Sequence, residues 1–230
     1  MGTYVIGDLH GCYQQWIDFK DHIEEIDIDA KFILIGDILD RGPSVRRLLG
    51  WCRLNISANG KYQMIMGNHE YEQINWERNK NKLRFYQKLP FYKDITINGQ
   101  RFIIVHASLP ESMVKEDGSL KTFNEITPSE AFDMVWSRSF RPFTAIPGAI
   151  LVHGHSPTIF EDSFRKGEFS GDKLGKVYDL GNRYNVDCGA VYEHITGHRL
   201  AALRLDDMEI FYNDEDKYKR SDLISCGNEK

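Results

Sequence analysis

The sequence lacks several features that would assign it to a common protein class. It has four cysteines but no C-x-x-C pair, which excludes the usual zinc-knuckle and redox motifs and favours reduced, structural thiols. No apolar run approaches the ~20 residues that a membrane helix needs, and the first residues leave no room for a signal peptide. We therefore expect a cytoplasmic protein with no membrane association.

An excess of basic charge is also missing. The 34 Asp and Glu residues outnumber the 29 Lys and Arg residues, and the formal net charge is −5. A protein that binds the phosphate backbone of nucleic acid is normally basic. We therefore expect no nucleic-acid partner.

The length and apolar content favour one folded unit. The chain has 230 residues, of which 41% are hydrophobic, which is enough for a sizeable core. No repeat or linker interrupts it, so we predict a single catalytic domain over residues 1–230. The segment after about residue 212 is a polar tail.

The first ninety residues alternate short β-branched runs with helical patterns, which is the rhythm of βαβ units. Predicted strands cover Thr3–Ile6, Phe32–Ile35 and Tyr62–Met66, and predicted helices cover Gln14–Ile26 and Ser44–Cys52. In the first helix Trp16, Phe19 and Ile23 recur at helical spacing, so this helix should lie on a sheet.

Strands dominate the later part of the chain. Asn98-Gly99 is a typical turn between two strands of a hairpin. The predicted strands are Asp94–Ile97, Arg101–Val105, Ala149–Val152, Leu200–Leu205 and Glu209–Tyr212. The Gly-, Asp- and Lys-rich stretch Glu161–Asn185 is interpreted as a mobile excursion. We predict an α/β fold in which two mixed β-sheets pack as a sandwich flanked by helices.

Polar side chains that can bind metals follow the predicted strands at five places. These are Gly7-Asp8-Leu9-His10-Gly11, Gly36-Asp37-Ile38-Leu39-Asp40-Arg41-Gly42, Gly67-Asn68-His69-Glu70, Val105-His106-Ala107 and Gly154-His155-Ser156. One Gly-Asp after a strand is usually a plain turn, but five such loops in order are not. Carboxylate, amide and imidazole together suit Mn, Fe or Zn, and their number is sufficient for two ions.

Three of these loops carry the signatures GDxHG, GDxxDRG and GNHE, in order and about thirty residues apart. With them the sequence resembles the phosphoprotein phosphatase family of calcineurin-like metallophosphoesterases, in its small bacterial and phage-type branch, over roughly residues 3–212. The resemblance implies two divalent ions, with Mn²⁺ as the expected metal. It implies that Asp8 and His10 bind the first ion, that Asp37 bridges both, and that Asn68, His106 and His155 complete the second.

The resemblance also implies the catalytic groups. Asp40 would pair with His69 and keep this imidazole oriented and protonated as a general acid. Arg41 and Arg138 would grip the phosphate oxygens through their planar, bidentate guanidinium groups. For Arg138 a plain surface arginine beside a buried tryptophan remains the alternative.

The expected reaction is direct attack of a metal-bound hydroxide on phosphorus, with a phosphorylated protein or a small phosphoester as substrate. Glu70 favours a serine/threonine-type protein phosphatase, because the symmetrical dinucleoside tetraphosphate hydrolases that the sequence also resembles tend to carry Asp there. Such a hydrolase is the alternative, and a non-catalytic metal-binding module is a third. The sequence shows no sign of docking to a regulatory subunit.

Some neighbouring residues receive structural interpretations. Glu70 is expected to hold its loop as a hydrogen-bond acceptor. His153 is either a packed core residue or a support for the site, and we assign no chemistry to His194 or His198. A structural role is also favoured for the segment Asp187-Cys188-Gly189-Ala190.

Overall fold

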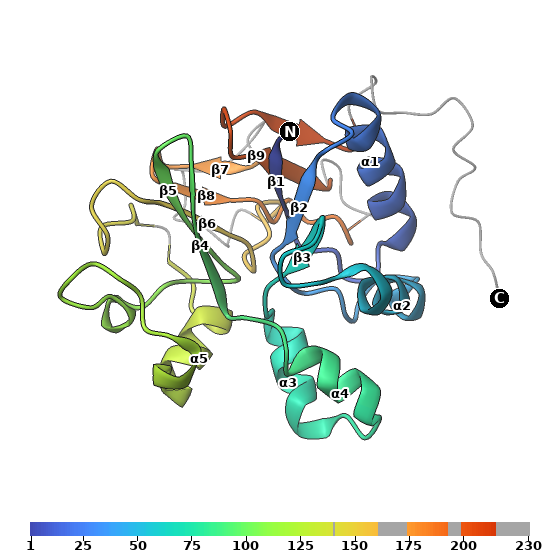
Figure 1. Ribbon diagram of the computed structural model, residues 1–230. Coiled ribbons are helices and arrows are strands. Elements are labelled where there is room, and N and C mark those ends of the chain that lie inside the picture. Colours follow the sequence, from blue (N-terminus) through green and yellow to red (C-terminus); the bar gives the residue numbers. More distant parts are fainter. Residues whose placement is uncertain (140, 161–173, 193–198, 215–230) are drawn as a thin grey trace.

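Two mixed, five-stranded β-sheets face each other in the computed structural model (Figure 1). The structure describes residues 1–139, 141–160, 174–192 and 199–214. Helices flank the sheets, so the predicted α/β sandwich is confirmed.

The first sheet has the strand order β10-β9-β1-β2-β3. Its members are β1 (Thr3–Ile6), β2 (Lys31–Leu34), β3 (Tyr62–Met64), β9 (Ala201–Arg204) and β10 (Ile210–Tyr212). Strands β1, β2 and β3 are parallel, while β9 runs antiparallel to β1. The three parallel strands therefore end at one common edge.

The second sheet has the strand order β4-β5-β6-β8-β7. Its members are β4 (Tyr92–Ile97), β5 (Gln100–Val105), β6 (Ile150–His153), β7 (Tyr178–Asp179) and β8 (Arg183–Asn185). Strands β5, β6 and β8 are parallel, with β4 and β7 antiparallel at the two margins. Asn98 has a left-handed backbone at the hairpin turn between β4 and β5, as the Asn-Gly pair predicts.

Alternate residues of the strands fill two different cores. Val5 and Ile33 of the first sheet belong to one buried cluster with Ile104 and Val152 of the second. The residues between them, such as Tyr4, point to the opposite face and pack against helices. Because both faces are covered, strands β1, β2 and β6 have largely apolar sequences.

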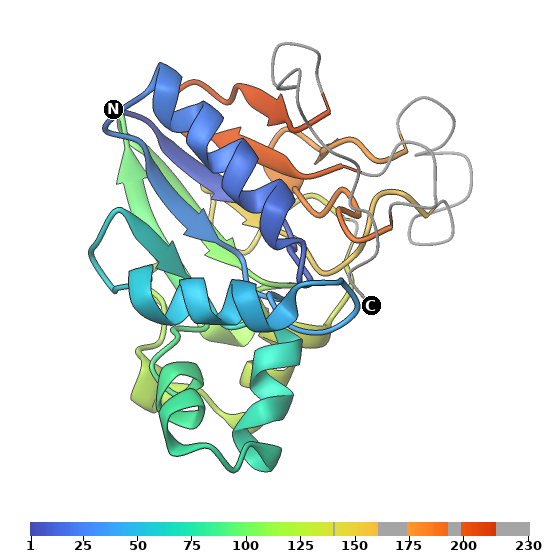
Figure 2. The same ribbon diagram turned by 90° about the vertical axis from the view of Figure 1, so that its right-hand side faces the viewer.

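Helices α1 (Tyr13–Ile26) and α2 (Val45–Asn55) lie over the outer face of the first sheet (Figure 2). The buried side chains Trp16, Phe19 and Ile23 form the apolar stripe of α1. Among the described residues no helix is long and apolar enough to cross a membrane.

Three further helices gather at the lower end of the sandwich in Figure 1: α3 (Asn68–Trp76), α4 (Lys80–Tyr86) and α5 (Pro128–Trp136). Two 3-10 turns, Glu111–Met113 and Phe123–Glu125, precede α5. This end is also where the parallel strands of the first sheet terminate, so α3 and α5 flank the edge that carries the polar loops.

The sequence-based assignment left out helices α3, α4 and α5 and the short strands β7 and β8. The interpretation of Glu161–Asn185 as an excursion is wrong for its second part, because β7 and β8 lie there. Two- and three-residue strands are too short to show an apolar period of their own, and only their partners in the sheet define them. Residues 161–173, His194, His198 and the tail beyond residue 214 lie outside the described residues.

Candidate metal centre

The candidate ligands follow parallel strands of both sheets at the same edge. Asp8 follows β1, Asp37 follows β2, and Asn68 begins α3 after β3. His106 follows β5 directly, and His155 follows β6. Open α/β sheets bind ligands beyond the carboxyl ends of their strands, and here two such ends meet.

Several side chains of this edge stand on a left-handed backbone, which is costly for residues other than glycine. The φ angles are 37° at His10, 51° at Asp37, 61° at Asp40, 64° at Arg41 and 66° at His155. Such strain persists where the surrounding structure imposes it, and it concentrates at functional sites. The sharp turns aim these side chains into one small volume.

Asp37 is the central carboxylate of this volume. Its Oδ2 lies 3.5 Å from Nε2 of His10 and 3.4 Å from Nε2 of His106. The ligand atoms of His10, Asp37 and His69 lie within 4.8 Å of one another, and so do those of Asp37, His106 and His155. Because Asp37 belongs to both groups, two cations held here would share it.

Backbone carbonyls fix the orientation of two of these imidazoles. Nδ1 of His10 lies 2.7 Å from the carbonyl oxygen of Leu39, and Nδ1 of His106 lies 2.8 Å from that of Ile35. When each Nδ1 donates its proton to the carbonyl, Nε2 is left with a lone pair that faces Asp37. This is the usual arrangement of a metal-binding histidine.

Asn68 connects the two histidines of the second sheet. Its Oδ1 lies 3.0 Å from Nε2 of His106 and 3.0 Å from Nδ1 of His155. The three side chains are buried and converge on one point. An amide oxygen and two imidazole nitrogens that face one another could all serve as ligands of one cation.

Glu70 holds together two of the three loops of the first sheet that carry candidate ligands. Its carboxylate accepts backbone N–H groups of Asp37 at 2.7 Å, Ile38 at 3.1 Å and Gly67 at 3.2 Å. This is the loop-holding role expected from the sequence. Burial, followed by the charge of Asp37, raises the pKa of Glu70 to about 8.

The electrostatics of the cluster fit divalent cations. Asp8 and Asp37 are almost fully buried, and burial together with the charge of Asp187 raises the pKa of Asp8. Burial opposes the ionisation of Asp37, but His106 and His10 hold its pKa below the ordinary value. Burial lowers the pKa of His10 to about 4, so this ligand is neutral at neutral pH. Burial opposes the protonation of His106, but Asp37 raises its pKa to about 10, so a cation bound by this imidazole would replace its proton. Buried carboxylates beside imidazole nitrogens form a site for cations.

Asp40, His69 and Arg41 form a chain at the mouth of the cluster. Nδ1 of His69 lies 2.6 Å from Oδ2 of Asp40, and its Nε2 lies 3.9 Å from Oδ2 of Asp37. Arg41 places Nη1 2.7 Å from Nε2 of His10 and Nη2 3.2 Å from Nε2 of His69. The structure thus brings the predicted acid, its carboxylate and one predicted phosphate-binding arginine together.

Arg138 lies on the His155 side of the cluster. Its Nη1 donates to Oγ of Ser156 at 3.0 Å. The ring of Trp136 contacts the ring of His155 edge-on, with centroids 5.7 Å apart. Two arginines therefore approach the cluster from different elements, which gives an anion two points of attachment.

Asp8 and His69 differ from the arrangement that the sequence resemblance implies. The compact group around His10 contains His69, whereas the carboxylate of Asp8 accepts the backbone N–H of His155 at 3.3 Å through each oxygen. His69 is already engaged by Asp40 through Nδ1. Asp8 nevertheless borders the cluster, because the charges of Asp37 and His106 act on its carboxylate.

Sequence reasoning missed two contributors to this site. The charges of Arg41 and Arg138 both act on the Tyr192 hydroxyl, and no sequence motif indicates this tyrosine. Asp187 received only a structural interpretation, yet it is buried close to Asp8. Its position after a β-strand could have identified it, had β8 been recognised. His153, in contrast, is buried with Nδ1 3.1 Å from the carbonyl of Gly154, and joins neither group of ligands.

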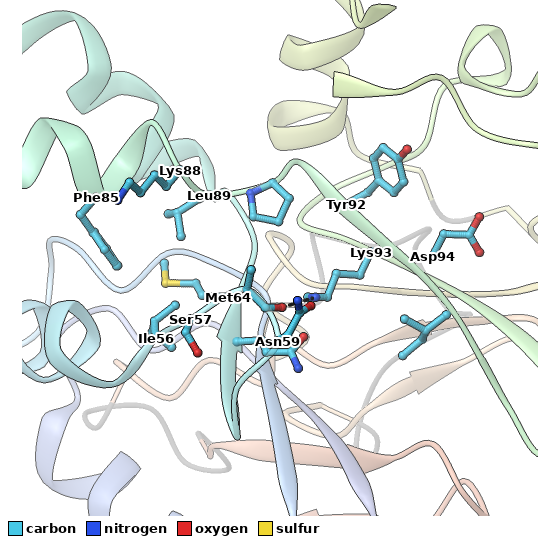
Figure 3. A pocket seen from close by; sticks show the side chains of 14 residues that line it. Ile56, Ser57, Asn59, Met64, Phe85, Lys88, Leu89, Tyr92, Lys93 and Asp94 are labelled. Carbon is cyan, nitrogen blue, oxygen red and sulfur yellow. Dashed lines mark hydrogen bonds between the residues drawn. The ribbon is translucent and has the colours of Figure 1, made fainter. Parts of the chain in front are cut away.

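A separate cavity of about 740 Å³ lies between the margins of the two sheets, next to β3 and β4 (Figure 3). Met64, Phe85, Leu89 and Lys93 are among the residues that line it, and none of the candidate ligands does. The candidate ligands therefore lie at the strand ends and not in this hollow.

A comparison with protein families agrees with this geometry. The model of the calcineurin-like phosphoesterases matches residues 1–199. The chain belongs to this family. Hydrolysis of phosphoester bonds is the activity that the family supports for it.

Individual relatives carry different names. A bis(5'-nucleosyl)-tetraphosphatase PrpE, asymmetrical, from Bacillus cereus strain Q1 is 24% identical over 90% of this chain and 91% of its own length. A symmetrical bis(5'-nucleosyl)-tetraphosphatase from Methylobacillus flagellatus is 34% identical, but over only 30% of this chain and 24% of that protein. A protein serine/threonine phosphatase from Saccharomyces cerevisiae superimposes with a TM-score of 0.58 at 14% identity, covering 92% and 78% of the two chains. This last likeness shows the fold alone.

Proposed function

We propose that the chain is a serine/threonine-type protein phosphatase that hydrolyses phosphomonoesters with two divalent metal ions. The observation that carries the proposal is the pair formed by His69 and Asp40 beside Asp37. A serine or threonine alkoxide is a very poor leaving group, and its departure needs a proton. A phosphate leaving from an anhydride needs this help much less.

In the proposed reaction Nε2 of His69, which accepts from Arg41 in this structure, takes up a proton from solvent once phosphate has displaced the guanidinium, and gives it to the leaving oxygen. Asp40 accepts from Nδ1 and keeps the ring in the orientation that points Nε2 at the cluster. Arg41 now spans His10 and His69, so an incoming phosphate would draw its guanidinium away from Nε2. Arg138 would bind a second edge of the phosphate.

The residues that would hold the metals are Asp8, His10, Asp37, Asn68, His106 and His155. The chemistry supplied by two divalent ions when bound is activation of water and neutralisation of charge on the phosphoryl oxygens. The mixed oxygen and nitrogen donors favour Mn²⁺, with Fe or Zn as alternatives. We further propose a cytoplasmic location, which is supported by free, buried thiols at Cys52 and Cys188.

Hydrolysis of dinucleoside tetraphosphates is the second candidate. It is supported by the PrpE relatives, whose similarity extends over most of the chain. It is also supported by Phe132, whose ring is 53% exposed and stacks on Trp136 at a centroid distance of 6.2 Å. Trp136 in turn contacts His155, so a nucleobase could stack near the metal centre.

One side-by-side assay separates the two candidates. The Mn²⁺-loaded enzyme is given phosphoserine and phosphothreonine peptides and, separately, diadenosine tetraphosphate at equal concentrations. The proposal expects the peptides to have a clearly higher kcat/KM. A preference for the dinucleotide, reduced by Phe132→Ala while peptide turnover is unaffected, would instead establish the second candidate.

A further inference from the structure

Asp187 occupies the one parallel strand end that the predicted ligand set leaves out. Strand β8 lies parallel to β6, with His153 opposite Asn185. Two residues further along, the same register places Asp187 opposite His155. Every other parallel strand of the two sheets delivers a candidate ligand to this edge, so β8 would be the exception without Asp187.

The carboxylate of Asp187 is buried and only half satisfied. The residue is 2% exposed. Its Oδ1 accepts the N–H of Gly189 at 3.2 Å, whereas Oδ2 has no hydrogen-bond partner among the described residues. The backbone is held on both sides, because its N–H donates to Asn185 and its carbonyl accepts from Thr158. A buried, unpaired carboxylate oxygen is costly, and the rigid backbone prevents it from turning to solvent.

Two glycines bring Asp187 close to Asp8. A Cβ placed on Gly154 would lie 2.3 Å from Oδ1 of Asp8 and 3.4 Å from Cβ of Asp187. A Cβ placed on Gly7 would lie 3.5 Å from Cα of Asp187. Only glycine permits this approach, and it leaves two buried carboxylates beside each other with like charges. A cation is the natural partner for such a pair.

We infer that Asp187 is a metal-site residue, whose free carboxylate oxygen serves the cation held by Asp8, His10 and Asp37. The inference rests on the two-metal centre proposed above. The negative charge of Asp187 increases the affinity of this first site, while the second site, formed by Asn68 and the two histidines of the second sheet, does not depend on it.

The test measures metal binding without any substrate. Asp187→Asn keeps the acceptor for Gly189 and removes the charge. Mn²⁺ is titrated into apo-protein by calorimetry, and the bound ions per chain are counted by elemental analysis. We expect two ions in the wild type, and a loss of affinity of roughly 10–100-fold at one site only in the variant. Should Asp187→Asn fold poorly, Asp187→Ser keeps an acceptor in a smaller side chain.

Asp179→Asn is the matched control. Asp179 accepts the N–H of Gly181 in the same two-residue pattern, but it is exposed and remote from the ligands in sequence. It should leave both sites unchanged. Two ions bound to Asp187→Asn with wild-type affinity would overturn the inference and leave the metal centre standing. A wild-type protein that binds no Mn²⁺ would overturn the centre itself, and the inference with it.

Discussion

His69 is the residue on which the proposed chemistry depends most directly. Its two ring nitrogens have different surroundings, with Asp40 at Nδ1 and Arg41 at Nε2. Asp40 and Arg41 both have a left-handed backbone, so the loop is conformationally strained at these two residues. A purely structural imidazole would not need two strained neighbours.

Replacement of the proposed acid should depend on the leaving group. His69→Asn should reduce turnover of a phosphoserine peptide by ~10²–10⁴-fold, and that of p-nitrophenyl phosphate distinctly less, because p-nitrophenolate departs without a proton. Asp40→Asn should show the same bias in milder form. The measurement is kcat on both substrates, with the metal content checked for each variant. Equal losses on both substrates with both metals retained would show that His69 positions phosphate and donates no proton.

Replacement of Asp37 should affect both metal ions. Because its carboxylate lies between His10 and His106, Asp37→Asn should weaken both metal sites at once. Elemental analysis after dialysis against Mn²⁺ should find fewer than two ions per chain. Asp40→Asn, which alters a neighbouring carboxylate of the same loop, is the control and should retain both. Two ions at wild-type affinity in Asp37→Asn would contradict a shared ligand.

Helix α5 is the element that links the surface to the site. Its N-cap is Thr127, whose Oγ1 accepts from the backbone N–H of Glu130, while the Glu130 carboxylate accepts from the N–H of Thr127. Lys121 also donates to Glu130, at 2.6 Å. The helix ends at Trp136, which contacts His155, and Arg138 follows two residues later. The cap at one end therefore stabilises the helix that leads to Arg138, the arginine proposed to bind phosphate.

The cap should be measurable in the free energy of unfolding. Thr127→Ala should lower it by ~1 kcal/mol, the usual cost of losing an N-cap side chain. Urea denaturation monitored by circular dichroism measures this change. Thr122→Ala removes a similar contact from the exposed 3-10 turn Phe123–Glu125 and should cost less. An equal loss in both variants would show that α5 has no special dependence on its cap.

The charge of Glu130 adds a pH dependence to the same helix. Hydrogen bonds from Lys121 and Thr127 lower the pKa of Glu130 from its ordinary value of 4.5 to about 2. The stabilisation is therefore fully present above pH 4.5 and is lost as the pH falls through about 2. The difference in free energy of unfolding between wild type and Glu130→Gln should be constant above pH 4.5 and shrink below it. A difference that persists unchanged down to pH 2 would contradict this.

At the scale of the whole molecule, the candidate metal centre joins the two sheets. Asp8, Asp37 and Asn68 come from the first sheet, whereas His106 and His155 come from the second. The apolar cluster between the sheets holds them face to face. Ions bound by ligands from both sides would also tie together the loops at their shared edge.

Metal binding should therefore raise the melting temperature. A ligand at one hundred times its Kd stabilises the folded state by about 2.7 kcal/mol, and for a chain of this size each kcal/mol shifts Tm by ~2–4 °C. Mn²⁺ should raise Tm by roughly 5–10 °C over the chelated protein in a thermal melt. Ca²⁺, which prefers oxygen ligands, should give a smaller shift. Identical Tm values with and without Mn²⁺ would contradict a centre that joins the sheets.

The sequence by itself determined the two-sheet α/β fold and the five loops that carry the candidate ligands. The reason is physical, because apolar strands of four or more residues and sharp Gly-Asp turns leave local signals that need no distant partner. Thr3–Ile6 and the hairpin at Asn98 were recognisable for this reason. The residue types that suit transition metals were equally visible in the loops around Asp37 and His106.

Tertiary structure decided what depends on partners far apart in the chain. Strand β8 exists because β6 pairs with it, and only this pairing carries Asp187 to the edge beside His155. The approach of Asp187 to Asp8 needs glycines at positions 7 and 154, whose roles are invisible until the two sheets are packed. Local patterns specify which residues can bind, but their distances and burial are set by packing, and these determine which of them share one site.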